Sequence, residues 1–167
     1  MPIRIGILTI SDRSWRGERP DKSGPALVKA VSQQGWQVTR TKIVPDDTEQ
    51  IKKTLTEWAD ADELDVILTT GGTGFNPRDV TPEATQAVIQ RPTPGLVEAM
   101  RNAGLHITPH AMLSRATAGI RSQSLIVNLP GSPSAAVENL EVILPVLPHA
   151  IQLLRDEPSA EAGHSRI

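Results

Sequence analysis

Residues 3–10, IRIGILTI, form an almost unbroken aliphatic and β-branched run that stops at the polar Ser11. Such a run is typical of a strand that is covered on both faces, as the strands of a parallel sheet are. Similar runs occur at 64–70, LDVILTT, and at 124–129, SLIVNL, with helical spacing between them. Strands that alternate with helices predict an α/β, three-layer, single-domain fold with a mainly parallel central sheet and helices on both faces.

The other segments complete this expected layout. The segment 36–44 has no cleanly apolar face, which predicts an edge strand. Residues 114–121 and 124–129 flank a turn near Arg121 and Ser122, which predicts a short antiparallel hairpin. Helices are expected over 26–34, after an Asp47 N-cap, from a Thr81 N-cap followed by Pro82, over 95–103, and over 134–154 with a break at Pro145 and Pro148. We expect one domain over 1–155 and a disordered polar tail over 156–167.

The composition excludes several classes of function. The 167 residues contain no cysteine, which excludes disulfides, thiolate metal sites and a cysteine nucleophile. The net charge is −2 and the aromatic content is 2%, so we expect neither an electrostatic attraction to nucleic acid nor an aromatic platform that stacks bases. No apolar run is long enough to span a membrane, and residues 1–4 lack the layout of a signal peptide, so we expect a cytoplasmic protein.

Unusual composition gathers in the loops that follow the expected strands. These loops are Ser11–Gly24, Pro45–Asp47, Gly71–Thr81 and Asn128–Pro133, and all are rich in Gly, Pro, Ser, Thr or Asp. In open parallel sheets, ligands bind beyond the carboxyl ends of the strands. The four loops therefore predict one shared binding site at that edge of the sheet.

The third loop begins Gly71-Gly72-Thr73-Gly74 and carries the strongest signal. Glycines let the backbone approach an anion and offer it N–H groups, although a bare GGTG also fits a tight turn without a ligand. Further along this loop, Arg78 and Asp79 add a cation and a carboxylate before a helix start. These two residues favour a binding function for the loop.

Asp46 and Asp79 follow neighbouring strands, and each precedes a helix that another residue is expected to cap. Two surplus carboxylates are sufficient for Mg²⁺, which takes one or two of them together with substrate phosphates. Solvated turn aspartates are the alternative interpretation. The four histidines lie outside the loops, and Pro109 between His106 and His110 argues against a chelating pair on a helix.

The last loop, Asn128 to Pro133, reads NLPGSP. Gly131 and Ser132 offer N–H and hydroxyl donors beside a helix start, which suits a phosphate, although a rigid turn is the alternative. Arginine outnumbers lysine 12 to 5, a bias that suits phosphate recognition but that genome composition also produces.

The chain resembles the molybdopterin-binding MoaB/Mog domain family, specifically its molybdopterin adenylyltransferases. The resemblance covers residues 4–154 and rests on ILTISDR (7–13), DKSGP (21–25), VPDD (44–47), TTGGTGFNPRDVTPEAT (69–85), MLSRATAGIR (112–121) and NLPGSP (128–133). It implies an enzyme of molybdenum cofactor biosynthesis that uses Mg²⁺ and ATP to adenylylate molybdopterin and releases pyrophosphate. A pterin-binding scaffold with the same fold but without the transfer is the alternative.

The resemblance also implies roles for individual residues. Asp46 and Asp79 are expected to be catalytic and to organise Mg²⁺ and the triphosphate, and Arg78 either screens phosphate charge or pairs with a neighbouring acid. The nucleotide is expected to lie on Gly71, Gly72, Thr73 and Gly74, and the pterin and its phosphate on Ser11, Asp12, Asp21, Ser23, Asn128, Pro130, Gly131 and Ser132. The family implies a homotrimer or hexamer, with a downstream molybdenum-insertion protein as a possible partner.

The chain's four aromatic residues divide into two groups. Trp36 and Trp58 fall on strand and helix patterns and are expected to be structural, whereas Trp15 and Phe75 lie in the first and third loops. We predict that Trp15 or Phe75 lies close enough to shield or stack on a bound adenine or pterin ring.

Overall fold

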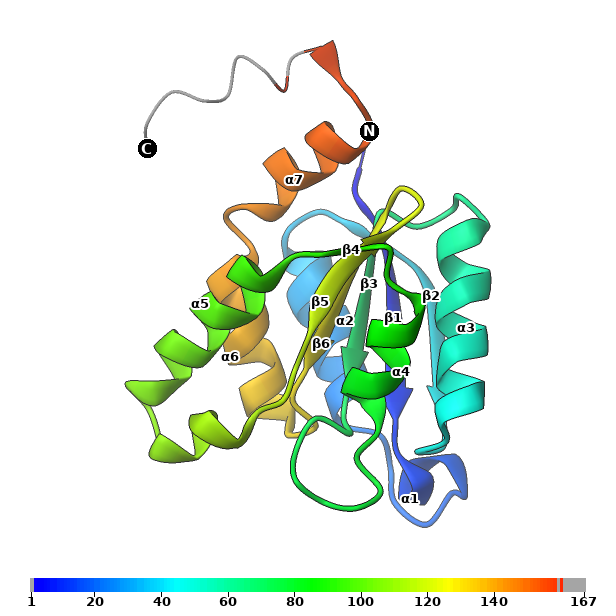
Figure 1. Ribbon diagram of the computed structural model, residues 1–167, viewed down its shortest axis with the longest axis vertical. Helices are drawn as coiled ribbons and strands as arrows, with labels where there is room; N and C mark the ends of the chain where they lie inside the picture. Colours follow the sequence, from blue (N-terminus) through cyan, green and yellow to red (C-terminus); the bar gives the residue numbers. More distant parts are fainter. Residues whose placement is uncertain (1, 159, 161–167) are drawn as a thin grey trace.

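The computed structural model describes residues 2–158 and 160 (Figure 1). The strands are β1 (Arg4–Ile10), β2 (Gln37–Val44), β3 (Val66–Thr70), β4 (Arg91–Pro92), β5 (Ala118–Arg121) and β6 (Ser124–Leu129). The helices are α1 (Asp12–Trp15), α2 (Ser23–Gln33), α3 (Thr48–Asp60), α4 (Thr81–Val88), α5 (Pro94–Leu105), the 3₁₀ helix η1 (Pro109–Leu113), α6 (Pro133–Ile143) and α7 (Leu147–Leu154).

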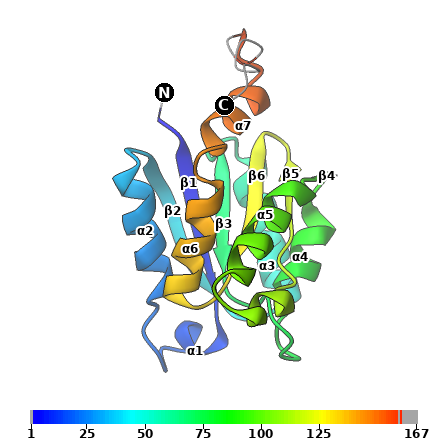
Figure 2. The same ribbon diagram turned by 90° about the vertical axis from the view of Figure 1, so that its left-hand side faces the viewer.

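These strands form one sheet in the order β2-β1-β3-β6-β5-β4. The pairs β2–β1, β1–β3 and β3–β6 are parallel, and β5 pairs antiparallel with β6 and with β4. The mainly parallel sheet, the hairpin and the edge position of β2 are therefore confirmed. Helices cover both faces, so the three-layer α/β prediction is also correct (Figures 1 and 2).

Two aliphatic clusters hold these layers together. One joins the sheet to α2, α5, α6 and α7 and includes Leu27, Leu68 and Leu140; the other joins it to α3 and α4 and includes Leu55 and Trp58. All residues of β3 are buried because this central strand is covered on both faces. The structural role predicted for Trp58 is confirmed, since its exposed fraction is 5%.

Local details differ from the predictions in two places. Val80, not Thr81, is the N-cap of α4, and the hydroxyl of Thr81 instead donates to the carbonyl of Gly71 at 2.9 Å. The predicted N-cap at Thr81 was wrong because the buried carbonyl of Gly71 binds the hydroxyl that would have capped the helix. The first loop also contains a short helix, α1, which the Ser11 side chain caps by accepting from the N–H of Ser14.

Asp65, just before β3, fastens the end of the sheet opposite the four loops. Its buried carboxylate accepts hydrogen bonds from the backbone N–H of Arg4 at 2.7 Å and from the Arg4 and Arg155 guanidinium groups. Burial raises the pKa of Asp65, but these hydrogen bonds outweigh burial and hold the pKa below its usual range. The carboxylate thereby joins the start of β1 to the end of α7.

The last helical region is broken as predicted, into α6 and α7. Within residues 2–158 and 160, no single helix is long and apolar enough to cross a membrane, and α6 and α7 reach that length and composition only as a pair bent by 65°. Beyond α7, Glu157 donates its N–H to Gln152, and Ala160 is buried. Residues 159 and 161–167 of the predicted tail lie outside the described residues.

Candidate active site

Four strand ends meet at one edge of the sheet. β1, β2, β3 and β6 run in the same direction, so the loops that follow them lie together at the lower edge in Figure 1. Between these loops lies a cleft of about 450 Å³. Its lining residues are Thr9, Ile10, Ser11, Ser14, Arg19, Pro20, Asp21, Lys22, Ser23, Asp46, Thr70, Gly71, Gly72, Asp79, Gly131, Ser132 and Pro133.

The position of the cleft follows from the topology. The chain leaves β1 through α2 to reach β2 on one side, and it later returns through α3 to β3 on the other side of β1. The connections thus diverge between β1 and β3, and such a switch point opens a crevice at the carboxyl ends of the strands. Ile10 of β1 and Thr70 of β3 line the cleft at this point.

Gly71 and Gly72 bring the backbone of the third loop into the cleft. Their φ angles are +105° and +69°, values that side-chain-bearing residues rarely adopt. A Cβ on Gly71 would collide with the carbonyl oxygen of Ile10, and a Cβ on Gly72 would collide with the Thr81 hydroxyl and lie 3.1 Å from Asp46 Oδ1. Glycine is therefore required where this loop passes the strand ends.

Asp46 and Asp12 link the first two loops by a reciprocal pair of hydrogen bonds. The N–H of Asp12 donates to Asp46 Oδ2 and the N–H of Asp46 donates to Asp12 Oδ1, both at 2.9 Å. Burial raises the pKa of Asp46, with further contributions from the nearby charges of Asp12 and Asp79. The cleft therefore holds a carboxylate whose charge a cation would stabilise.

Asp79 also lines the cleft, and the loop that carries it holds its carboxylate in place. Asp79 Oδ2 accepts the N–H groups of Gly74 and Asn76, both at 3.1 Å. Among the described residues, neither Asp79 Oδ1 nor Asp46 Oδ1 receives a hydrogen bond. Each carboxylate thus keeps one oxygen available for a ligand.

These two carboxylates fit a magnesium ion that substrate phosphates help to hold. Within residues 2–158 and 160 no group of three or more acidic or histidine side chains is arranged to hold a metal by itself. Mg²⁺ is commonly bound by one or two carboxylates together with phosphate oxygens and water. The free oxygens of Asp46 and Asp79 and the raised pKa of Asp46 match that mode of binding.

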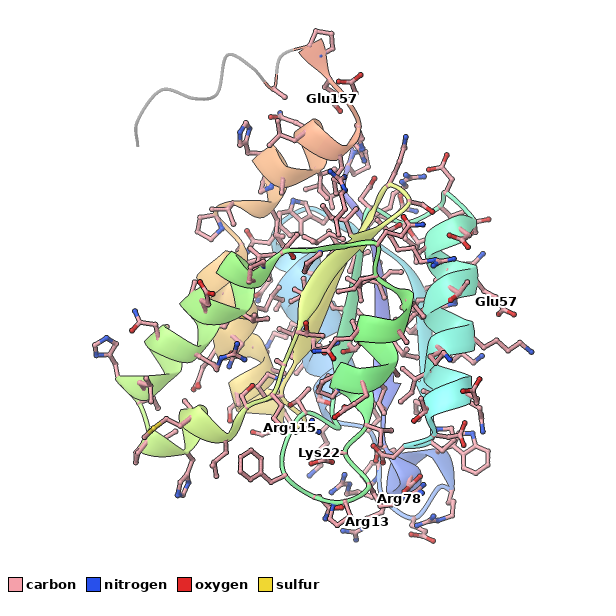
Figure 3. All side chains as sticks on the ribbon, in the orientation of Figure 1. Arg13, Lys22, Glu57, Arg78, Arg115 and Glu157 are labelled. Atoms are coloured by element: carbon pink, nitrogen blue, oxygen red, sulfur yellow. The ribbon has the colours of Figure 1, made fainter. Side chains whose placement is uncertain are left out.

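Arg78 pairs with an acid, which is the second of its two predicted interpretations. Its guanidinium donates to both Asp12 carboxylate oxygens, at 3.0 and 3.1 Å, and these bonds hold the pKa of Asp12 below its usual range. The pair connects the first and third loops across the rim of the cleft. Neither Arg78, labelled in Figure 3, nor its partner Asp12 lines the cleft, so the pair acts on the site by holding the two loops together.

Asp21 and Ser23 line the cleft, but the Asp21 carboxylate already has protein partners. Asp21 Oδ2 accepts the Thr9 hydroxyl at 2.7 Å, and its Oδ1 accepts the N–H of Gly24 at 3.0 Å. The carboxylate thus fastens the start of α2 to the end of β1. Its geometry supports a role in shaping the first loop, and its contact with a pterin stays a prediction.

The start of α6 and the first loop supply groups that suit an anion. Ser132 is the N-cap of α6, and Gly131 and Ser132 both line the cleft, so the positive end of the helix dipole points there. Arg19 and Lys22 line the cleft from the first loop. The sequence prediction omitted these two cations, although their charge in a loop at a strand end was the signal that could have found them.

Several predicted site residues lie outside the cleft. Asn128 is fully buried, and its amide donates to the Thr69 and Thr85 hydroxyls and accepts the N–H of Thr117, so its placement is structural. Thr73, Gly74 and Pro130 instead line a neighbouring cavity of about 290 Å³.

The predicted contact between a loop aromatic and a bound ring stays a prediction. Neither Trp15 nor Phe75 lines the cleft, and their exposed fractions are 53% and 68%.

A family model described as "Probable molybdopterin binding domain" matches residues 6–149. The chain belongs to this family. Among solved structures, the domain is 51% identical, with a TM-score of 0.88, to the molybdopterin biosynthesis enzyme MoaB from Thermus thermophilus, over 93% of this chain and 98% of that one.

Among curated proteins, the domain is 47% identical to gephyrin from Dictyostelium discoideum and 42% identical to the molybdopterin adenylyltransferase of Helicobacter pylori strain 26695. The first match covers 96% of this chain but only 24% of that gephyrin's length. The second covers 91% of this chain and 88% of the Helicobacter protein. The chain therefore spans about a quarter of the gephyrin and nearly the whole of the bacterial relative.

Proposed function

We propose that this molybdopterin-binding domain acts in molybdenum cofactor biosynthesis as a molybdopterin adenylyltransferase. It would transfer the adenylyl group of Mg²⁺·ATP to molybdopterin and release pyrophosphate. Support comes from the Helicobacter relative of that name, which the chain matches over most of both lengths. The observation that carries the proposal is the pair Asp46 and Asp79 facing a cleft lined by backbone amides and a helix N-terminus.

The reaction requires no nucleophile from the protein. A phosphate oxygen of molybdopterin would attack the α-phosphorus of ATP, forming a new P–O bond, and the bond from that phosphorus to the bridging oxygen would break so that pyrophosphate leaves with the electron pair. A phosphate is already an anion near neutral pH. Among the described residues, no histidine lines the cleft, and the sequence contains no cysteine.

Catalysis would then rest on positioning and on charge compensation. Gly71 and Gly72 would bring the phosphates close to the backbone, and the start of α6 with Arg19 and Lys22 would attract their charge. Asp46 and Asp79 would hold Mg²⁺, which supplies positive charge at the phosphates when bound. The acidic and cationic groups that line the cleft would together align the two anionic substrates despite their mutual repulsion.

The direct test is whether ATP is consumed only when molybdopterin is present. We expect Mg²⁺-dependent pyrophosphate release with both substrates, and none when molybdopterin is omitted. Binding of molybdopterin without any pyrophosphate release would contradict the proposal and support the scaffold alternative.

We also propose that the protein assembles into a homotrimer, or a hexamer built from trimers, in the cytoplasm. We further propose that it passes its product to a molybdenum-insertion protein.

An exposed apolar surface lies along the end of α5 and η1, and such patches often mark interfaces. Its side chains are those of Leu105, Ile107, Met112 and Leu113. Ile107→Glu with Met112→Glu is expected to shift the sedimenting species towards the monomer. An unchanged sedimentation profile would contradict assembly through this surface.

A further inference from the structure

Arg115 lies outside the cleft, on the segment between η1 and β5, yet it contacts the glycine loop through three separate groups (Figure 3). Its Nε donates to the carbonyl of Gly74 and its Nη2 to the carbonyl of Asp79, both at 2.8 Å. Its backbone N–H donates to the carbonyl of Thr73, also at 2.8 Å. The guanidinium additionally pairs with Glu83 at the start of α4.

The two carbonyls that the guanidinium binds lie at the two ends of the segment 74–79. This segment contains neither helix nor strand, and residues 75–78 are exposed. Inside it, the Asp79 carboxylate accepts the N–H groups of Gly74 and Asn76. Arg115 therefore fastens from outside the same loop that the Asp79 carboxylate closes from inside.

The planar fork of the guanidinium suits simultaneous contacts with two carbonyls and a carboxylate. A guanidinium presents several N–H donors in a fixed plane, whereas a lysine ammonium is a compact point charge on a flexible stem. The chain around Arg115 is itself held, because Arg101 Nη1 donates to the carbonyl of Ala116 at 3.0 Å. Hydrogen bonds therefore hold both the guanidinium of Arg115 and the backbone next to it.

We propose that Arg115 is a positioning residue, which fixes the direction of the Asp79 carboxylate and of the loop amides at the cleft. This inference rests on the proposed function for its catalytic consequence. The structural part of the inference, that Arg115 holds the loop 74–79 closed, does not depend on that function. Arg115 touches neither substrate nor metal in this assignment, and it acts through Asp79.

Hydrogen exchange at the Gly74 and Asn76 amides, followed by NMR, tests the closure without requiring any enzymatic activity. In Arg115→Gln we expect both amides to exchange at least about tenfold faster than in the wild type. Glu83→Gln removes the ion pair but leaves both carbonyl contacts, so we expect less than about a twofold change.

Arg121→Gln is the matched control for loss of a guanidinium fork. Arg121 binds Asp60 and the carbonyl of Val88 at the other end of the sheet, and its loss is expected to leave the Gly74 and Asn76 amides protected. Arg115→Lys keeps the charge and serves if the Gln variant does not fold, and it too is expected to expose these amides. Unchanged exchange in the Lys variant, or equal loss of protection in Arg121→Gln, would overturn the proposal.

A double-mutant cycle tests the catalytic consequence. In the wild-type background, we expect Arg115→Gln to lower kcat by at least about tenfold, with KM for molybdopterin changed less than about threefold. In an Asp79→Asn background, we expect the same substitution to lower the remaining kcat only slightly further. If the kcat losses of the two single variants multiply in full in the double variant, Arg115 does not act through Asp79 and the proposal is overturned. A wild-type protein without adenylyl transfer would refute the proposed function, while the exchange result would still decide the role of Arg115 in the loop.

Discussion

At the residue scale, Asp46 combines a cost to folding with a role in the site. Its carboxylate is partly buried beside Asp12 and Asp79, and burial raises its pKa. As the pH rises between the ordinary and the raised pKa, the unfolded chain loses its proton first, so this group lowers the stability of the folded protein. Such a residue is explained by the cation it would hold and not by a contribution to stability.

Asp46→Asn should therefore separate stability from activity. We expect the variant to lose adenylyl transfer by at least about 10²-fold, because one of the two carboxylates proposed to hold Mg²⁺ becomes neutral. Its melting temperature should equal or exceed that of the wild type at neutral pH, and this advantage should vanish below the ordinary aspartate pKa. Calorimetry across this pH range, together with an activity assay, measures both effects, and near-wild-type activity would refute the metal assignment.

At the element scale, the strands and the site could be predicted because both follow from patterns along the chain. The aliphatic runs of β1 and β3 identify buried strands, and their shared direction brings polar loop residues such as Asp46 and Ser132 to one edge. Contacts between distant segments could not be predicted in the same way. The N-cap of α4 depends on whether Thr81 finds the carbonyl of Gly71, and no local pattern reports that.

Asn128 illustrates the same limit at the end of β6. An asparagine at a strand end serves a ligand or the packing of neighbouring elements equally well, and only the fold shows its amide between β3 and α4. Gly131, Ser132 and Pro133, which follow soon after Asn128, do line the cleft. The direction in which a strand-end side chain points decides between these roles.

Asn128→Ala is expected to destabilise the protein by about 2–4 kcal/mol, because it leaves buried partners of the amide unsatisfied. The N–H of Thr117 loses its acceptor, and two buried hydroxyls lose a donor. Urea unfolding measures this change. Ser134→Ala, at an exposed position in the first turn of α6, is the control, and equal stability of Asn128→Ala and wild type would contradict the structural placement.

At the scale of the whole molecule, one end of the sheet carries the candidate site and the other carries contacts that stabilise the fold. The carboxyl ends of the strands gather acidic and cationic loops around the cleft, whereas the opposite end is fastened by Asp65 with Arg4 and Arg155. This buried group lies far along the chain from its partners and joins β1, β3 and α7. The stabilising contacts of Asp65 offset groups at the other end that oppose stability, such as Asp46.

Asp65→Asn should destabilise the protein by about 3 kcal/mol at neutral pH, because it leaves two arginines without their buried counter-charge. The pKa of Asp65 is lowered in the folded protein, so its contribution is complete above the ordinary value of 3.8 and is lost as the pH falls through the folded pKa. The difference between variant and wild type should shrink in that acid range. Denaturant unfolding at several pH values measures it, and a pH-independent difference would contradict the assignment.

The most direct test of the central claim follows the α-phosphate of ATP. Purified protein is incubated with molybdopterin, Mg²⁺ and ATP carrying ³²P at the α-position, and the pterin is then separated from nucleotide. Label is expected in the pterin, in amounts equal to the pyrophosphate released, with at least about 10²-fold less label in Asp79→Asn and none without Mg²⁺. Molybdopterin that binds to the wild-type protein but remains unlabelled would contradict it.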